Sequence, residues 1–136
     1  MSASLSWPKG VFWVLFIVVT FLTLTPNPPE TEPGFALTRW IASVLFHDVA
    51  LADKVAHFMA YGSLGAAARW AQLTLFSKRW SIVLGLAAYG VLLEGLQGLG
   101  GVRTPELADA VANGAGALAG YAGAHLLGVV LQLRAR

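Results

Sequence analysis

Eight side chains that could do acid–base or ligand-binding chemistry fall in three short stretches of an otherwise apolar chain. Together they provide two cations, an imidazole, three carboxylates and two amides. The eight residues are Asp53, Lys54, His57, Glu94, Gln97, Arg103, Asp109 and Asn113. Such a set could bind a phosphate through its cations or move a proton through its imidazole and carboxylates.

The spacing of these residues places them on shared faces of helices. His57 follows Asp53 by four residues and Lys54 by three, so all three share one face. Glu94 and Gln97 are three residues apart, and 109 and 113 are four apart. Helices that present these faces to one another would bring the eight side chains together.

The chain that carries them is too apolar for a soluble domain. Of its 136 residues, 57% are apolar and only 12% are charged, against about 25% charged in soluble domains. This composition excludes a disordered chain, and with a net charge of +2 it excludes a basic nucleic-acid-binding domain. The absence of cysteine excludes disulfides, thiolate metal sites and thiol nucleophiles.

We therefore predict an all-α membrane protein, with residues 1–136 as a single domain. About 20 apolar residues cross a bilayer, and the apolar runs predict a bundle of four transmembrane helices. Their approximate ranges are 9–25, 54–76, 80–99 and 105–133. The proline-rich segment 26–52 is predicted as an outward loop. It contains a short helix at the membrane interface, since 35–46 is apolar and aromatic but too short to span. The small residues Gly116 and Gly120 predict close packing of helices within the chain.

Charge predicts the orientation. If both termini and the turn at 77–80 share one side, that side holds six of the nine basic residues and none of the acidic ones. The positive-inside rule then places both termini in the cytoplasm. The second and fourth helices begin at the outward end and the third helix ends there, so the polar residues would gather at that end.

The motifs resemble those of VanZ-like membrane proteins over roughly residues 50–125. The first is Asp53-Lys54-x-x-His57-Phe58-x-x-Tyr61-x-x-Leu64-Gly65. The second runs through Glu94-x-x-Gln97, Arg103 and Asp109-x-x-x-Asn113-x-x-Gly116-x-x-x-Gly120. This resemblance implies a small helical protein of the bacterial inner membrane. It also suggests a link to teicoplanin resistance, with which the founding member is associated.

Three hypotheses for the function follow. We favour a site that binds a phosphorylated lipid or a lipid-linked cell-wall precursor, with Asp53, Lys54, Gln97, Arg103 and Asn113 as ligand-binding residues. The second hypothesis is an enzyme acting on such a headgroup. In it His57 is the nucleophile or acid–base group, Glu94 and Asp109 are further catalytic residues, and Arg103 stabilises charge. The third is a structural partner of a membrane complex, in which the polar cluster only holds helices together.

We predict no required cofactor. His57, Glu94 and Asp109 could nevertheless hold a divalent cation. With only one histidine in the cluster, Mg²⁺ or Ca²⁺ would suit these ligands better than zinc.

Overall fold

The computed structural model of the chain describes residues 6–25, 36–101 and 104–135. These residues form five α-helices and one short 3-10 helix, with no β-strand among them, so the predicted helical class is confirmed. The elements are α1 (Trp7–Leu24), α2 (Ala36–Phe46), η2 (Val49–Leu51), α3 (Ala52–Trp70), α4 (Ser81–Leu99) and α5 (Leu107–Arg134).

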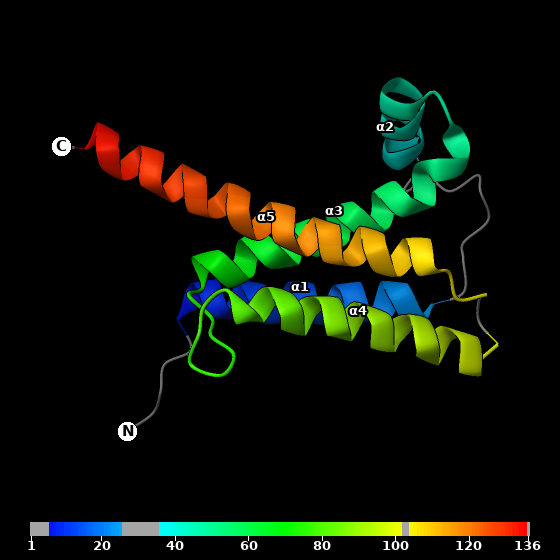
Figure 1. The fold of residues 1–136 in the computed structure, drawn as a ribbon, viewed down its shortest axis with the longest axis horizontal. Helices are drawn as coiled ribbons and strands as arrows, with labels where there is room; N and C mark the ends of the chain where they lie inside the picture. Colours follow the sequence, from blue (N-terminus) through cyan, green and yellow to red (C-terminus); the bar gives the residue numbers. More distant parts are fainter. Residues whose placement is uncertain (1–5, 26–35, 102–103, 136) are drawn as a thin grey trace.

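The four long helices form two layers (Figure 1). α3 and α5 lie side by side in one layer, and α1 and α4 lie together in the other. α3 and α5 both begin at the end of the bundle where α1 and α4 finish. α2 lies crosswise at that same end and packs on the start of α3 through Ala42, Ala52 and Val55. The starts of α3 and α5 and the ends of α1 and α4 therefore meet at one end of the bundle.

Three helices, α1, α4 and α5, are long and apolar enough to cross a membrane. α3 has a similar length of 19 residues, but Asp53, Lys54 and Arg69 lie in it. Because of these charged residues, α3 is long enough but not apolar enough to be among the candidate spans. Eight residues of α3 are buried, against two in α1. α3 is thus the helix that the others cover.

The second predicted span also ends earlier than expected. α3 stops at Trp70 rather than 76, and the chain turns back with positive φ angles at Gln72, Phe76 and Ser77. A left-handed backbone cannot continue an α-helix. The Ser81 hydroxyl donates to the carbonyls of Leu75 and Lys78 and so secures the turn. The apolar residues Leu73, Leu75 and Phe76 predict a continuing helix. That prediction is wrong here because apolar content carries no information about these backbone angles.

The other boundaries agree within two residues. The fourth predicted span was expected to start at Pro105, but α5 begins at Leu107 with Glu106 as its N-cap. Pro105 instead lies against Gly98 near the end of α4, where an added Cβ would come within 2.7 Å of the proline ring. The proline-rich part of the predicted outward loop, residues 26–35, lies outside the described residues.

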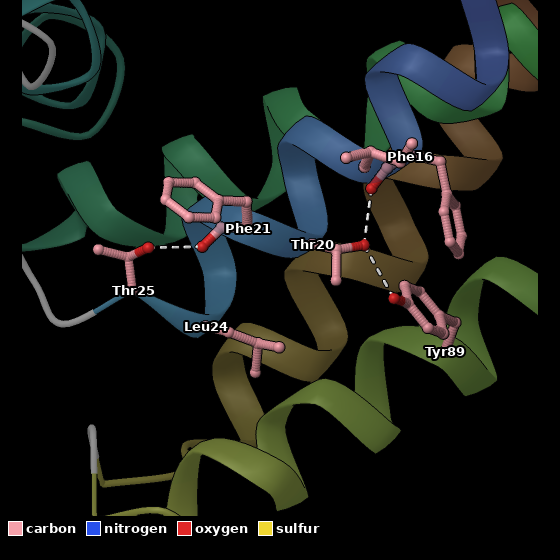
Figure 2. A pocket seen from close by; sticks show the side chains of 7 residues that line it. Phe16, Thr20, Phe21, Leu24, Thr25 and Tyr89 are labelled. Carbon is pink, nitrogen blue, oxygen red and sulfur yellow. Dashed lines mark hydrogen bonds between the residues drawn. The ribbon is translucent and has the colours of Figure 1, made fainter.

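α1 and α4 meet through a small aromatic contact (Figure 2). The rings of Phe16 and Tyr89 stack with their centroids 4.6 Å apart. The Thr20 hydroxyl donates to the Phe16 carbonyl, so its oxygen accepts the Tyr89 hydroxyl at 2.8 Å. Beside this contact, a largely apolar groove of about 470 Å³ runs along α1 to Thr25.

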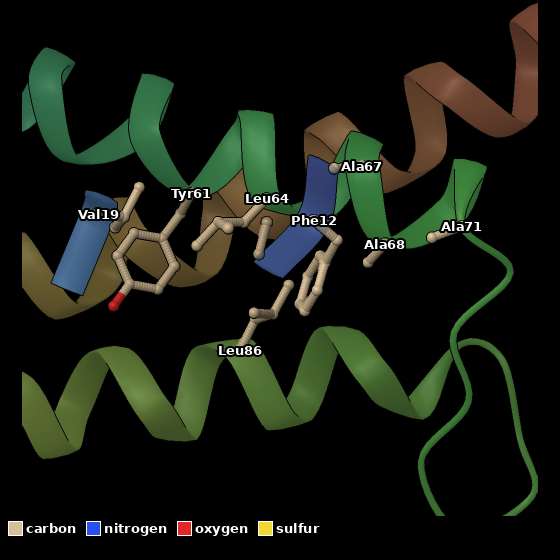
Figure 3. Packing of buried hydrophobic residues seen from close by; sticks show 9 residues of the cluster. Phe12, Val19, Tyr61, Leu64, Ala67, Ala68, Ala71 and Leu86 are labelled. Atoms are coloured by element: carbon tan, nitrogen blue, oxygen red, sulfur yellow. The ribbon is translucent and has the colours of Figure 1, made fainter. Parts of the chain in front are cut away.

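The apolar core lies between α1, α3 and α4 (Figure 3). Tyr61 and Leu64 of α3 are fully buried there, against Phe12 of α1 and Leu86 of α4. The outer faces of α1, α4 and α5 instead expose many large apolar side chains. In water such a surface would be unfavourable, whereas lipid chains can cover it.

Candidate functional site

Backbone contact between α3 and α5 sets the geometry of the polar cluster. An added Cβ at Gly65 would lie 2.1 Å from the Ala117 carbonyl oxygen, and one at Gly120 would lie 1.8 Å from that of Gly62. The helices can approach this closely only because no side chains intervene. The prediction that the glycines at 116 and 120 pack within the chain is confirmed, and their contacts fix how far α5 slides along α3.

That register brings His57 of α3 against Asn113 of α5. The imidazole Nδ1 lies 2.9 Å from the amide oxygen of Asn113, and both side chains are buried. An amide oxygen only accepts hydrogen bonds, so Nδ1 carries the proton and donates it. The other ring nitrogen, Nε2, then presents its lone pair when the ring is neutral. α4 leaves room for Asn113 because it has a glycine there, Gly90, where an added Cβ would lie 2.9 Å from that of Asn113.

Three carboxylates surround the same imidazole. Asp53 Oδ1 and Asp109 Oδ2 each lie 3.9 Å from Nε2, while Glu94 Oε1 lies 3.8 Å from Nδ1. These separations are too long for hydrogen bonds but short enough for strong electrostatic coupling where water is excluded. Asp53 and Asp109 therefore face one nitrogen of the ring, and Glu94 faces the other.

Lys54 lies at the rim of the cluster. Its ammonium is 2.8 Å from Asp109 Oδ1 and 3.4 Å from Asp53 Oδ2, and it also contacts Glu106. Asp109 is fully buried, whereas the Glu106 side chain is 47% exposed. The ammonium thus connects the floor of the site to its surface. Glu106 is not among the residues predicted from the sequence, because its place as the N-cap of α5 does not reveal a contact to a residue 52 positions away.

Gln97 has a different role from the one predicted. Its amide donates to the Thr23 carbonyl near the end of α1, and the side chain is buried. It therefore links α4 to α1 and does not face the imidazole through this nitrogen. Arg103, the second predicted cation, lies outside the described residues.

The structure thus brings six of the eight predicted residues into one cluster at one end of the bundle. These are Asp53, Lys54, His57, Glu94, Asp109 and Asn113. Their roles in binding or catalysis stay predictions. The groove between α1 and α4 contains none of them.

Another polar contact lies at the opposite end of the bundle. The Arg69 guanidinium of α3 donates to Nδ1 of His125 in α5, at 3.1 and 3.3 Å, and both side chains are solvent-accessible. This pair is separate from the cluster.

The comparison with protein families bears on this same arrangement. The family model of VanZ/LLP1 matches residues 12–128. The chain belongs to the VanZ/LLP1 family. The match also includes most of α1, which the motif resemblance over 50–125 did not reach. No curated protein and no solved structure matches the chain.

In this VanZ-family protein, charge at the cluster is predominantly acidic. Asp53, Glu94, Glu106 and Asp109 are four carboxylates, and Lys54 is the one lysine or arginine among the described residues of the cluster. Among the described residues the cluster is thus rich in groups that can hold cations or protons, and Lys54 lies at its rim.

Proposed function

We propose that this VanZ-family protein binds the phosphorylated headgroup of a membrane lipid or of a lipid-linked cell-envelope precursor. The binding site is the outward end of a four-helix transmembrane bundle in the bacterial inner membrane. Lys54 is the main support for this proposal. Its ammonium lies at the rim of the cluster, between the buried Asp109 and the exposed carboxylate of Glu106. A phosphate oxygen can take the place of the Glu106 carboxylate on the ammonium, since both are anionic acceptors.

The ends of the helices favour an anion at the same place. α3 and α5 both begin at the cluster, and the amino end of a helix carries a partial positive charge. Asp53 and Asp109 lie in the first turns of these helices, where that charge stabilises them. A phosphate at the rim would experience both helix ends together with Lys54.

The groove between α1 and α4 supports a lipid as the ligand. It runs from Phe16, in the middle of α1, to Thr25, toward the end of the bundle where α3 and α5 begin, and its walls are largely apolar. Nine residues of helix correspond to about 14 Å, which suits part of an acyl chain. A headgroup at the rim and a chain along α1 would use both features.

The proposed topology places α3 as a fourth span that its neighbours shield from lipid. Such a helix tolerates charged residues when they face protein partners or lie near its ends, as Asp53, Lys54 and Arg69 do. α2 lies at the outer interface, because it is only 11 residues long and exposes Trp40 and Leu45. Both termini are then cytoplasmic, as the charge distribution predicts.

Reporter fusions test the topology. A fusion after residue 78 should give fluorescence but no phosphatase activity, because its reporter stays in the cytoplasm. A fusion after residue 48 should give phosphatase activity but no fluorescence, because the basic turn and the acidic end lie at opposite ends of the bundle. The measurement is paired alkaline phosphatase and fluorescent-protein activity in cells. Phosphatase activity from the fusion at 78 would contradict the model of four spans.

Native mass spectrometry of the purified protein tests headgroup binding. Glu106→Gln should increase the fraction of protein that carries a phospholipid by about three- to tenfold, because it removes the anion that competes for Lys54. Arg103→Ala should reduce that fraction without lowering the melting temperature. Glu30→Gln is the matched control for the loss of one acidic charge from the outward segment, and it should leave the bound fraction unchanged.

Equal lipid occupancy in all of these variants would contradict headgroup binding. It would favour the third hypothesis, in which the cluster serves only to assemble helices or a membrane complex. Teicoplanin susceptibility of a deletion strain is the separate test of a link to glycopeptide resistance, which family membership suggests.

A second function, hydrolysis at the headgroup phosphate, is favoured by the orientation of His57. Asn113 fixes the proton on Nδ1, so Nε2 is the basic nitrogen, and it faces the side of Asp53 and Asp109. With no metal ion on Nε2, this nitrogen could take a proton from water while the water oxygen bonds to phosphorus and the bond to the lipid oxygen breaks. The departing alkoxide then takes a proton from bulk water and is released as the alcohol. His57→Gln should then bind lipid as the wild type does but release no alcohol product. Full turnover by this variant would exclude His57 as the base.

A further inference from the structure

The two carboxylates that hold Lys54 each use one oxygen for the ammonium and turn the other toward His57. Asp109 contacts Lys54 through Oδ1 and faces Nε2 with Oδ2. Asp53 contacts Lys54 through Oδ2 and faces Nε2 with Oδ1. The hydrogen bond to Asn113 holds the proton on the far side of the ring. Three atoms that carry lone pairs therefore converge on one point.

We propose that Asp53, His57 and Asp109 form a binding site for a divalent metal ion. One ligand atom from each residue lies within 4.8 Å of the other two. An ion equidistant from such atoms would lie under about 3 Å from each, so side-chain shifts of well under 1 Å reach the usual metal–ligand distances of about 2.0–2.6 Å.

The surroundings of the histidine are those of a metal ligand. Metal-binding imidazoles usually donate their other N–H to an oxygen acceptor, which fixes the tautomer and the ring orientation. Asn113 provides that acceptor at 2.9 Å and is fully buried. Two ligands four residues apart on α3 and a third from α5 also give a rigid frame, because backbone contact between glycines holds those two helices together.

The geometry changes the ligand set expected from the sequence. The sequence predicts Glu94 as a metal ligand together with His57 and Asp109. In the structure Glu94 faces Nδ1, the nitrogen that carries the proton. Asp53 takes its place on the Nε2 side. One imidazole with two carboxylates suits Mn²⁺ or Mg²⁺, which combine with nitrogen and oxygen ligands and retain water.

Charge and access also favour an ion here. A divalent cation would offset part of the excess of carboxylates over lysine among the described residues of the cluster. The side chains of Lys54 and Asp53 are 23% and 21% exposed, so the open coordination positions would face the rim. Water or phosphate oxygens could fill these positions. The statement that the ion also binds the headgroup rests on the proposed function, whereas the metal site itself does not.

Manganese binding to the purified protein tests the site. After treatment with EDTA, the wild type should bind one Mn²⁺ per chain, measured by the loss of the free-ion signal in electron paramagnetic resonance. A nitrogen coupling from His57 should appear in the pulsed spectrum of the bound ion. His57→Gln and Asp53→Asn should each weaken binding by at least tenfold, and His57→Gln should also remove the nitrogen coupling.

Two controls keep the assignment sharp. His125→Gln alters a histidine at the opposite end and should bind Mn²⁺ as the wild type does. Glu94→Gln should weaken binding less than Asp53→Asn does, because it removes a nearby charge but no ligand atom. Melting curves of every variant establish that it is folded. Failure of the folded wild type to bind Mn²⁺ stoichiometrically would overturn the proposal, as would unchanged binding by Asp53→Asn or a loss in Glu94→Gln as large as that in Asp53→Asn.

Measuring both Mn²⁺ binding and lipid occupancy distinguishes this proposal from headgroup binding. If Mn²⁺ binds as expected but lipid occupancy is equal in all headgroup variants, the metal site stands and the headgroup function is wrong. If lipid occupancy responds as predicted but Mn²⁺ does not bind, the metal site is wrong and headgroup binding stands.

Discussion

Gly120→Ala is expected to force α3 and α5 apart and to destabilise the protein more than any other single methyl group added to α5. The new Cβ would lie 1.8 Å from the Gly62 carbonyl oxygen and 2.9 Å from its Cα. Backbone cannot move aside as a side chain can, so the helices must separate. Overpacking of this kind costs about 1–3 kcal/mol or more, and a loss on the order of 10 °C in melting temperature should follow.

Gly123→Ala and Gly128→Ala are the matched controls. They add the same methyl group to the same helix, but no atom outside the helix's own backbone lies within 4 Å of either new Cβ. Because alanine favours helix over glycine, each should leave stability unchanged or raise it by about 1 kcal/mol. If Gly120→Ala melts together with these controls, backbone contact does not set the register of α3 against α5. Thermal melting in a single detergent compares all three.

Lys54→Met is expected to destabilise the protein by about 3–5 kcal/mol, because it removes the cation beside a buried carboxylate. Asp109 has no exposed surface, and its Oδ1 lies 2.8 Å from the ammonium. The methionine side chain matches the lysine stem in length and apolar character. The loss should therefore come from the charge rather than from packing.

The double variant Lys54→Met/Asp109→Asn should recover most of that stability, since it removes both charges of the pair. A double-mutant cycle from denaturation in mixed micelles gives the coupling energy, expected at roughly 2 kcal/mol or more. Lys9→Met is the control, because Lys9 is exposed at the start of α1. Additive effects of the two substitutions would contradict the buried pair.

The recovered double variant also informs the proposed function. It should be folded but lack the ammonium at the rim, so its lipid occupancy should fall even though its stability does not. Stability and headgroup binding would then respond differently to the same residue, which a purely structural role of Lys54 does not predict.

Composition and helical spacing determined the class of this protein and the face of each helix that carries polar groups. The excess of apolar residues and most of the helix breaks depend on the local chain alone. So does the relation of Asp53 to His57, because residues four apart in a helix must share a face. The helical class and the VanZ family could therefore be predicted without coordinates.

The tertiary structure decided how the faces meet. Whether Glu94 or Asp53 lies beside the basic nitrogen of His57 depends on the rotation of α4 and α5 about their axes. The contact of Lys54 with Glu106 depends on how far α5 slides along α3. The end of α3 at Trp70 depends on a turn with left-handed residues that apolar content does not encode. Helical periodicity fixes angles within a helix, but only close packing of one backbone on another, here at Gly62 and Gly120, fixes the register between helices.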